Sequence, residues 1–305
     1  MSLAPIALFV YNRLDHTKQT ITALQKNELA GKSELFIYSD ASNNKNTTSE
    51  VKGVREYLRT IDGFKNITIV ERKNNWGLAK SIINGVTSIV NEYGKIIVLE
   101  DDIVTSPYFL KFMNQALDFY KDEGKVWHIS GWNYPLNIKT KENLFFWNTM
   151  NCWGWATWED RWKHFNKDPE KLINNWSLEQ INSFDLNNSG VFWKQVEDNY
   201  FKKIDTWAIF WYSAIFENKG LCLNPCDSLV QNIGLDGSGT NCGNNNDFDL
   251  NLDFLNLNNF IFPEKPVISI FATNRIVKYY KKRKSFFAKG KRKLKGILNS
   301  WKINK

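Results

Sequence analysis

The chain has 305 residues, of which 43% are hydrophobic and 15% aromatic, and its formal net charge is +8 at pH 7. This length and apolar content are ample for one large domain, or for a domain with a substantial second lobe. The positive charge is concentrated, because residues 275–305 contain 13 Lys and Arg and no Asp or Glu, while residues 1–274 hold 27 basic and 32 acidic residues. The basic character therefore belongs to a tail and not to a groove.

The cysteine and histidine residues show no metal-ligand spacing. The four Cys, at positions 152, 222, 226 and 242, form no repeating pair, and the three His lie far from them in sequence. This pattern argues against a zinc site and favours reduced thiols in the cytoplasm. The N-terminal residues lack the features of a secretory signal, and no stretch is apolar for long enough to span a bilayer.

Strand and helix patterns alternate through the first hundred residues. Apolar runs predict strands at 5–10, 34–39, 66–70 and 96–99, and amphipathic spacing predicts helices at 14–29, around 54–61 and at 76–90. This alternation is typical of βαβ units that build a parallel sheet. We therefore expect an α/β fold, with a Rossmann-like, mostly parallel sheet flanked by helices, of nucleotide-binding type.

Three carboxylates directly follow the fourth predicted strand: Glu100, Asp101 and Asp102. In open α/β sheets the ligand crevice lies beyond the carboxyl ends of the strands, which is where these residues fall. Packing three like charges together costs Coulomb repulsion unless a cation neutralises them. The triplet therefore suggests a seat for a divalent metal and a diphosphate; the alternative is a solvated acidic turn that caps the next helix.

Other strand ends carry groups that suit a nucleotide. Arg13 follows the first strand and its planar guanidinium matches a phosphate, although it could instead pair with Asp15. Asp40 follows the second strand and could accept hydrogen bonds from a base or ribose, or merely cap a turn. Gly77 opens the third helix and allows close backbone approach, and Lys80 can reach back. No GxGxxG follows the first strand, so the usual dinucleotide fingerprint is missing.

These segments together resemble a known family. The order YNR, SDAS, LAKSIINGV and VLEDDIVTSPYFLKFM is similar to the nucleotide-sugar half of GT-A fold glycosyltransferases, of the N-acetylglucosaminyltransferase I type and the bacterial family 2-like sugar transferases. The resemblance implies Asp102 as the direct ligand of Mn²⁺ (or Mg²⁺), with Glu100 and Asp101 serving the sugar and ribose. It also implies a donor-binding set in which Asp40 meets the uracil and Arg13 the diphosphate, completed by Asn12, Gly77 and Lys80.

The acceptor side begins with the apolar run VWHISGWNY, in which His128 reads as a core histidine rather than a ligand. A tryptophan-rich run follows, in which Trp153 and Trp155 alternate as on a strand. An indole face can stack on a sugar and its N–H can donate to a hydroxyl, so Trp153 or Trp155 could form an acceptor platform, although most tryptophans are core residues. The WGWATW stretch is similar to one in the same bacterial transferases.

A catalytic base is sought in the helical region 169–216. Asp205 lies two residues before Trp207, where a lone aspartate would by composition be a helix N-cap. The transferase family places its base in an acidic-then-Trp segment ahead of the next strand pair, and Asp205 is the matching position. Asp198 and Glu197 are its nearest rivals.

Four glycines, at 234, 237, 239 and 243, lie in the segment NIGLDGSGTNCG of residues 232–243. Such a loop can fold over a bound ligand and exclude water, or serve as a plain surface linker. It is similar to the donor-ordered loop of the transferase family, which often has a histidine near its end. This chain has Asn241 there, so a loop histidine has no counterpart.

The basic tail interleaves its charges with bulky residues, among them Phe286, Phe287 and Trp301. This composition fits a peripheral anchor on anionic lipid headgroups, and the alternative is a solvated or nucleic-acid-binding tail. We expect an anionic membrane surface as the partner and no nucleic acid. The enzyme would then be cytoplasmic and peripheral on the inner face of the cytoplasmic membrane.

The sequence as a whole predicts a GT-A domain at residues 1–269, with a nucleotide-sugar half at 1–102 and an acceptor half at 103–269, and a basic amphipathic tail at 270–305. We expect a metal-dependent inverting glycosyltransferase that moves a sugar from a UDP-sugar to a glycan or lipid-linked saccharide, in bacterial surface polysaccharide or lipopolysaccharide synthesis. One alternative is a nucleotidyltransferase, which would need a Gly-rich signature that YNRLDH lacks. The other is a noncatalytic carbohydrate-binding protein that uses the tryptophan cluster.

Overall fold

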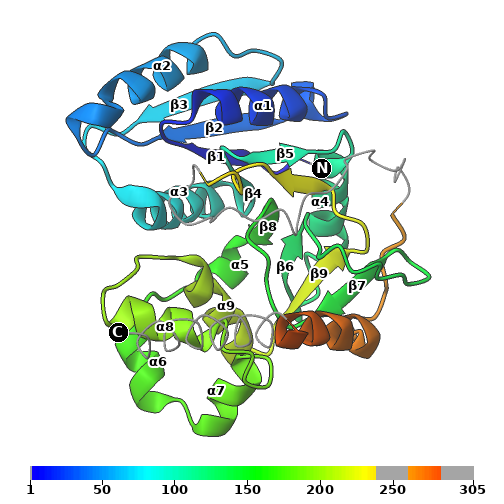
Figure 1. Cartoon of the computed structure of the whole chain (residues 1–305). Helices are drawn as coiled ribbons and strands as arrows, with labels where there is room; N and C mark the ends of the chain where they lie inside the picture. Colours follow the sequence, from blue (N-terminus) through cyan, green and yellow to red (C-terminus); the bar gives the residue numbers. More distant parts are fainter. Residues whose placement is uncertain (1, 238–259, 283–305) are drawn as a thin grey trace, which may run out of the picture. The chain divides into compact units, whose positions relative to one another are not determined.

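An eight-stranded sheet forms the centre of the fold (Figure 1). The computed structural model describes residues 2–237 and 260–282. The strand order is β3-β2-β1-β4-β8-β6-β9-β7. The strands have the following bounds: β1 Ile6–Val10, β2 Glu34–Ser39, β3 Asn66–Glu71, β4 Lys95–Glu100, β6 Val126–Ser130, β7 Leu144–Trp147, β8 Trp155–Trp158 and β9 Leu221–Pro225.

The strands and helices of the first hundred residues form in the predicted order, with α2 beginning and ending earlier than predicted. Strands β1 to β4 are parallel, and they are connected by helices α1 (Leu14–Gln25), α2 (Thr48–Leu58) and α3 (Gly77–Tyr93). Every residue of β1 is buried, as expected for an apolar run inside a parallel sheet. Helix α1 is shorter than predicted. The Asn27 amide donates to a carbonyl of its last turn, and the chain then enters a short 3-10 helix.

Four strands of the predicted acceptor half complete the same sheet. Strand β8 lies between β4 and β6 and runs antiparallel to both, β6 is parallel to β9, and β7 is antiparallel to β9. Strands β7 and β8 both come from the tryptophan-rich run. In the register of β4 and β8, Lys95 is opposite Trp158 and Val98 is opposite Trp155. Backbone hydrogen bonds therefore join the two predicted halves directly.

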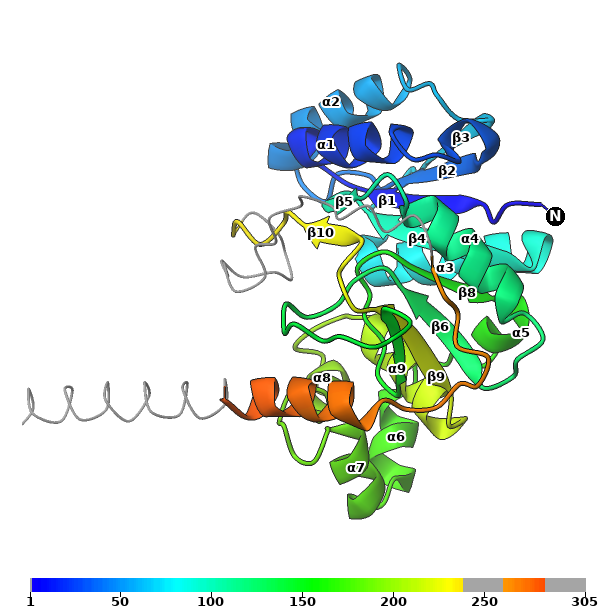
Figure 2. The same ribbon diagram turned by 90° about the vertical axis from the view of Figure 1, so that its right-hand side faces the viewer.

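A small antiparallel sheet pairs β5 (Ile103–Thr105), which directly follows β4 in sequence, with β10 (Val230–Asn232) (Figure 2). Helices α4 (Phe109–Phe119), α5 (Glu159–Trp162) and α9 (Ala208–Glu217) complete this part of the chain. The small sheet brings residues more than a hundred positions apart in sequence to the end of β4, which is where the acidic triplet stands.

Aromatic rings fill the core on the acceptor side. The ring centroid of Trp155 lies 5.2 Å from that of Trp207 and 5.4 Å from that of His128. The Trp211 indole N–H donates to His128 Nδ1 at 3.2 Å, and His128 Nε2 lies 3.1 Å from the Asn151 carbonyl oxygen. Burial lowers the pKa of His128 to about 3, so its ring is neutral. The prediction of a core histidine is confirmed.

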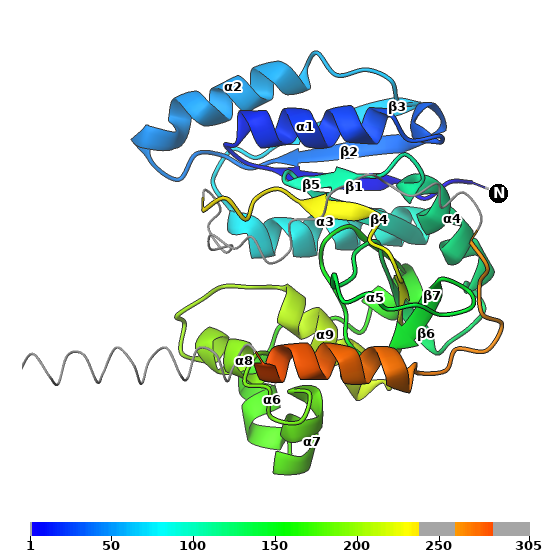
Figure 3. The same ribbon diagram turned by 45° about the vertical axis from the view of Figure 1, so that its right-hand side comes forward.

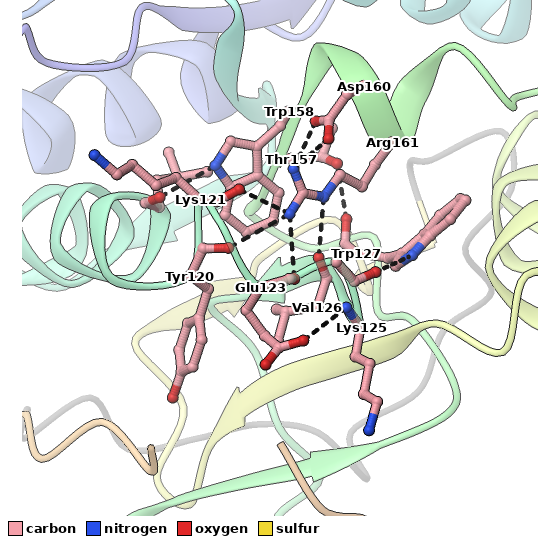
Figure 4. A network of polar contacts seen from close by, with 12 residues as sticks. Tyr120, Lys121, Glu123, Lys125, Val126, Trp127, Thr157, Trp158, Asp160 and Arg161 are labelled. Carbon is pink, nitrogen blue, oxygen red and sulfur yellow. Dashed lines mark hydrogen bonds and ion pairs between the residues drawn. The ribbon is translucent and has the colours of Figure 1, made fainter. Parts of the chain in front are cut away.

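A buried arginine binds the carbonyls of the segment that follows α4 (Figure 4). The Arg161 guanidinium donates to the carbonyl oxygens of Lys121 at 2.9 Å, Glu123 at 3.2 Å and Val126 at 3.3 Å. It also lies 4.7 Å from the ring centroid of Trp158. A guanidinium has five donors, so one side chain can satisfy several carbonyls at a helix C-terminus. Arg161 thus fixes the turn between α4 and β6.

A second compact unit is helical (Figure 3). It contains α6 (Pro169–Asn175), α7 (Leu178–Phe184) and α8 (Trp193–Tyr200), together with helical residues 270–282. The Phe192 ring lies 5.8 Å from that of Tyr280, so the start of the predicted tail packs within this unit. Among the described residues, no helix combines the length and apolar character needed to cross a bilayer. The rest of the tail, residues 283–305, lies outside the described residues.

Candidate active site

The acidic triplet of Glu100, Asp101 and Asp102 stands at the end of β4, beside the start of α1. Asp101 and Asp102 are buried, and Arg13, at the N-cap of α1, bonds to both. Its Nη2 donates to Asp102 Oδ2 at 2.8 Å and to Asp101 Oδ1. Its Nη1 is buried without a hydrogen-bond partner in the part of the chain that the structure describes. The alternative pairing with Asp15 is not the one that forms.

Burial sets the charge state of the triplet. Burial, together with the neighbouring Asp102 and Asp101 carboxylates, raises the pKa of Glu100 to about 8, so this side chain holds a proton near neutral pH. Burial also raises the pKa of Asp101 to about 6, although the Arg13 guanidinium opposes the shift. A single guanidinium therefore leaves the cluster short of positive charge, and a further cation would be attracted to it.

The Gly-containing loop begins directly beside the triplet. Strand β10 pairs with β5 so that Asn232 is opposite Ile103, and the Ile233 N–H donates to the Asp102 carbonyl at 2.9 Å. Further along, the Asp236 carboxylate lies 3.3 Å from a ring nitrogen of His16 on α1. The first part of the loop is thus fixed against both β4 and α1. Position 241 and the rest of the loop lie outside the described residues.

Asp40, at the end of β2, caps helix α3. Its carboxylate accepts hydrogen bonds from the backbone N–H groups of Trp76 at 2.9 Å, Gly77 at 2.8 Å and Ala41 at 2.9 Å. Gly77 has a φ of 72°, a left-handed conformation that glycine adopts without strain. The fold therefore brings the predicted donor residues Asp40 and Gly77 together, and it does so through the capping contact that the sequence had left as the alternative.

Two cations stack on the Trp76 ring next to this cap. The Lys80 Nζ lies 4.5 Å from the ring centroid, and the Arg72 guanidinium carbon lies 3.9 Å from it. Sequence reasoning did not select Arg72, whose signal was its place directly after β3, at the edge that carries Asp40. Its buried Nε has no hydrogen-bond partner among the described residues. Asn12, the remaining residue predicted to bind the sugar donor, forms a hydrogen bond from its side-chain amide to Glu50 Oε2 of α2 at 2.6 Å.

The fold separates the two tryptophans of the predicted acceptor platform. Trp155 has no exposed surface and packs in the core, so it has no face open to a sugar. The reason is Gly154, whose φ of 62° interrupts the extended backbone that strand alternation assumes. Trp153 is half-buried, and its ring lies 4.7 Å from that of Trp132. The candidate Trp155 was therefore wrong, and an acceptor role of Trp153 stays a prediction.

Asp205 is exposed and pairs with a lysine. Its side chain is 74% exposed, and its Oδ1 accepts a hydrogen bond from Lys167 Nζ. These two residues stand where the chain leaves the first compact unit and where it returns from the helical one. The ion pair therefore joins the two residues that flank the helical segment 168–204. This is a structural role beside the predicted catalytic one. The rival Asp198 pairs with Lys194 and Lys203 within the helical unit.

The residues of the triplet suit a metal that is shared with a ligand. No group of three or more His, Cys, Asp or Glu side chains in the described ranges is arranged as a ready-made metal site. Carboxylates are hard oxygen ligands, and Mg²⁺ in such sites is held by one or two carboxylates, with water and substrate phosphates completing its coordination. Asp102, with Arg13 as its neighbour, fits this kind of site better than an all-protein cage.

Replacing Glu100 by Gln should remove a cost that burial imposes at high pH. The unfolded side chain releases its proton near its ordinary pKa and the folded one near 8, so wild-type stability falls as pH rises through this window. We expect metal-free Glu100→Gln to melt a few degrees above wild type at pH 9, with a much smaller difference at pH 5. Scanning calorimetry in chelator measures both; an equal difference at the two pH values would contradict the burial argument.

Comparison with known proteins identifies the family. Residues 6–161, slightly more than half of the chain, match the model of Glycosyl transferase family 2. No curated protein matches the sequence.

Two solved structures are similar at low identity. One is the mannosyltransferase PcManGT from Pyrobaculum calidifontis in complex with GDP-Man and Mn²⁺, with 11% identity, 70% of each chain covered and a TM-score of 0.40. The other is TarS of S. aureus, with 13% identity, 46% of this chain and 24% of that chain covered, and a TM-score of 0.30. The family match spans strands β1 to β4, the acidic triplet and the tryptophan-rich run, and the chain belongs to glycosyl transferase family 2: it is a glycosyltransferase with a GT-A fold.

Proposed function

We propose that this glycosyltransferase moves a sugar from a UDP-sugar to a hydroxyl of a glycan or lipid-linked saccharide, with inversion and with a divalent metal. The proposed setting is the synthesis of a bacterial surface polysaccharide or lipopolysaccharide. The observation that carries the proposal is the cluster at the end of β4. It contains two buried carboxylates, a guanidinium that balances them only in part, and the unpartnered N–H of Arg13 Nη1 in the described residues.

Asp102 would hold the metal, Mn²⁺ or Mg²⁺, together with the diphosphate. When bound, the metal supplies positive charge beside the diphosphate leaving group. Arg13 adds its own charge at the same place, because Nη2 is held by Asp101 while Nη1 remains able to donate to a phosphate oxygen. Glu100 and Asp101 are proposed to serve the sugar and the ribose.

The base of the donor is proposed to lie along the ends of β2 and β3. Asp40 is the candidate for the uracil, and its bonds to the start of α3 hold Gly77 and Trp76 in place around it. Lys80, which stacks on the same tryptophan, and Asn12 complete the proposed donor contacts. The cap thus serves the site by fixing the backbone near the nucleotide.

Asp205 is proposed as the catalytic base of a single displacement. The acceptor hydroxyl oxygen attacks the anomeric carbon on the face opposite UDP, the bond from that carbon to UDP breaks, and the Asp205 carboxylate takes the hydroxyl proton. No covalent intermediate is needed. For this role the carboxylate has to leave Lys167, and its high exposure leaves it room to do so. Trp153 would support the sugar ring of the acceptor.

An anionic membrane surface is the proposed partner of the C-terminal residues, which would place the enzyme on the cytoplasmic face of the membrane. Helix 270–282 supports this, because Ala272 and Ile276 are buried whereas Ile270 and Phe271 are 73% and 52% exposed. Every charged residue on the exposed side of this helix is basic: Arg275, Lys278, Lys281 and Lys282. Two bulky apolar side chains followed by four cations suit an anionic headgroup layer.

Metal-dependent donor binding is the first test. We expect UDP to bind wild-type protein in Mn²⁺ about a hundredfold more tightly than in chelator, because a bound cation contributes several kcal/mol toward the phosphate charge. Asp102→Ala should remove the difference between the two conditions. Isothermal calorimetry measures all three affinities. Equal UDP affinity in Mn²⁺, in chelator and in the variant would remove the basis of the proposed function.

The base is tested against its structural role by a matched pair of variants. Both Asp205→Asn and Lys167→Met break the ion pair between these two residues, but only the first removes the carboxylate. We expect Asp205→Asn to lower kcat by about 10² to 10⁴ with UDP affinity retained, and Lys167→Met to keep kcat near wild type. Steady-state kinetics with a soluble acceptor distinguishes the two variants. Similar, small decreases of kcat in both would leave Asp205 with a structural role only.

Membrane docking is tested with vesicles. We expect the protein to sediment with phosphatidylglycerol vesicles at low salt and not with phosphatidylcholine vesicles, since each basic residue near an anionic surface contributes about 1 kcal/mol. The double variant Ile270→Ser with Phe271→Ser should release most of the protein from the vesicles. The control Leu178→Ser, at a residue that is 79% exposed elsewhere in the helical unit, should not change vesicle binding. Transfer to a soluble acceptor should be unchanged. Binding to nucleic acid instead of vesicles would contradict the proposal.

A further inference from the structure

We propose that Gly234 is a positioning residue of the donor site, which keeps the Asp102 carboxylate in place by letting the loop backbone lie directly against it. This inference rests on the proposed function and extends it. A Cβ atom at position 234 would overlap Asp102 Oδ2 and lie 2.8 Å from Arg13 Nη1. The φ of Gly234 lies outside the left-handed region, so the backbone conformation does not require glycine. The neighbouring carboxylate does.

Local structure delivers Gly234 to this place. Strand β10 pairs with β5 until Asn232 is opposite Ile103, so the returning chain reaches the triplet as it leaves the small sheet. The Ile233 N–H then donates to the Asp102 carbonyl at 2.9 Å, and the Gly234 N–H donates to Asn232 Oδ1 at 2.7 Å. Asn232 is only 6% exposed. These bonds form a tight turn whose third residue meets the carboxylate.

A contact beyond the turn fixes its other end. Asp236 pairs with His16, which lies three residues after Arg13 on α1 and therefore about one helical turn along it. Helix α1 thus carries both the guanidinium that bonds Asp102 and the imidazole that holds the loop. Asp102 is bounded by Arg13 and by the Gly234 backbone, and both boundaries are anchored on the same helix.

The consequence concerns one oxygen atom. Asp102 Oδ2 is the atom that Arg13 bonds, and it is also the atom that a Cβ at position 234 would displace. Moving this oxygen breaks its bond to Arg13 and turns the carboxylate proposed as metal ligand. Loss of a group that orients a metal-binding carboxylate typically weakens metal affinity by about 10- to 100-fold. Gly234 therefore acts through Asp102 rather than by contact with substrate.

A double-mutant cycle without any ligand tests the contact. Thermal unfolding is measured for wild type, Gly234→Ala, Asp102→Ala and the double variant. We expect Gly234→Ala to lower Tm in the wild-type background and to lower it much less beside Ala at position 102, because the displaced carboxylate is then gone. Gly124→Ala, where a Cβ would meet nothing within 4 Å, is the matched control and should leave Tm unchanged. Equal losses in both backgrounds would overturn the inference.

Calorimetry with UDP and Mn²⁺ tests the consequence. We expect folded Gly234→Ala to bind UDP about tenfold or more weakly than wild type, with Gly124→Ala unchanged. Should Gly234→Ala not fold, Asn232→Ala loosens the turn without adding an atom and should weaken UDP binding in the same direction. The inference would be overturned if folded Gly234→Ala bound UDP as tightly as wild type. If Asn232→Ala is used in its place, wild-type affinity for UDP in that variant would overturn it. Absence of UDP binding to wild type would instead count against the proposed function, and the ligand-free cycle would still decide the contact.

Discussion

The ion pairs of Arg13 with Asp101 and Asp102, formed across 88 and 89 residues of sequence, are the interaction on which the candidate site depends. Strand β1 lies beside β4 with Phe9 opposite Glu100, so the residues that follow the two strands meet at one edge of the sheet. Without the guanidinium, the buried carboxylates of Asp101 and Asp102 would repel each other at short range. With it, Asp101 and Asp102 can be buried and the small sheet can close over them.

The charge of the acidic triplet is only partly neutralised by Arg13. One cation faces three acids, and the pKa of Glu100 rises to about 8, so a proton does part of the neutralising. A cluster in this condition is stable enough to fold but favours any further positive charge that arrives. Under the proposed function, folding and binding would be linked through one set of side chains, since the charge deficit that the fold tolerates would attract the metal.

Local patterns were enough to predict the order of strands and helices in the first hundred residues, because β1 and β4 are buried apolar runs and each helix has an apolar face. The order of strands on the acceptor side was beyond such patterns. Strand β8 joins the sheet between β4 and β6, and only long-range pairing decides that position. The packing of helix 270–282 with α8 was hidden for the same reason, since a contact such as Phe192 with Tyr280 leaves no periodic signal.

At the site, sequence reasoning identified residue types better than their partners. The triplet and Arg13 were selected from their places at strand ends, but their mutual bonding depends on the register of β1 and β4. Trp155 was one of two candidates for an acceptor platform because strand alternation was extended across Gly154, whose positive φ interrupts that alternation. Gly234 was seen only as part of a flexible loop, because nothing in the sequence places it near position 102.

The continuous sheet has a consequence for how such an enzyme can work. Strand β8 is hydrogen-bonded to β4 on one edge and to β6 on the other, so the donor and acceptor sides share a single backbone lattice. A hinge between them would have to break these ladders, which hold buried strands. Under the proposed function, opening and closing would then fall to segments outside these ladders and not to a rotation of one part of this sheet against the other.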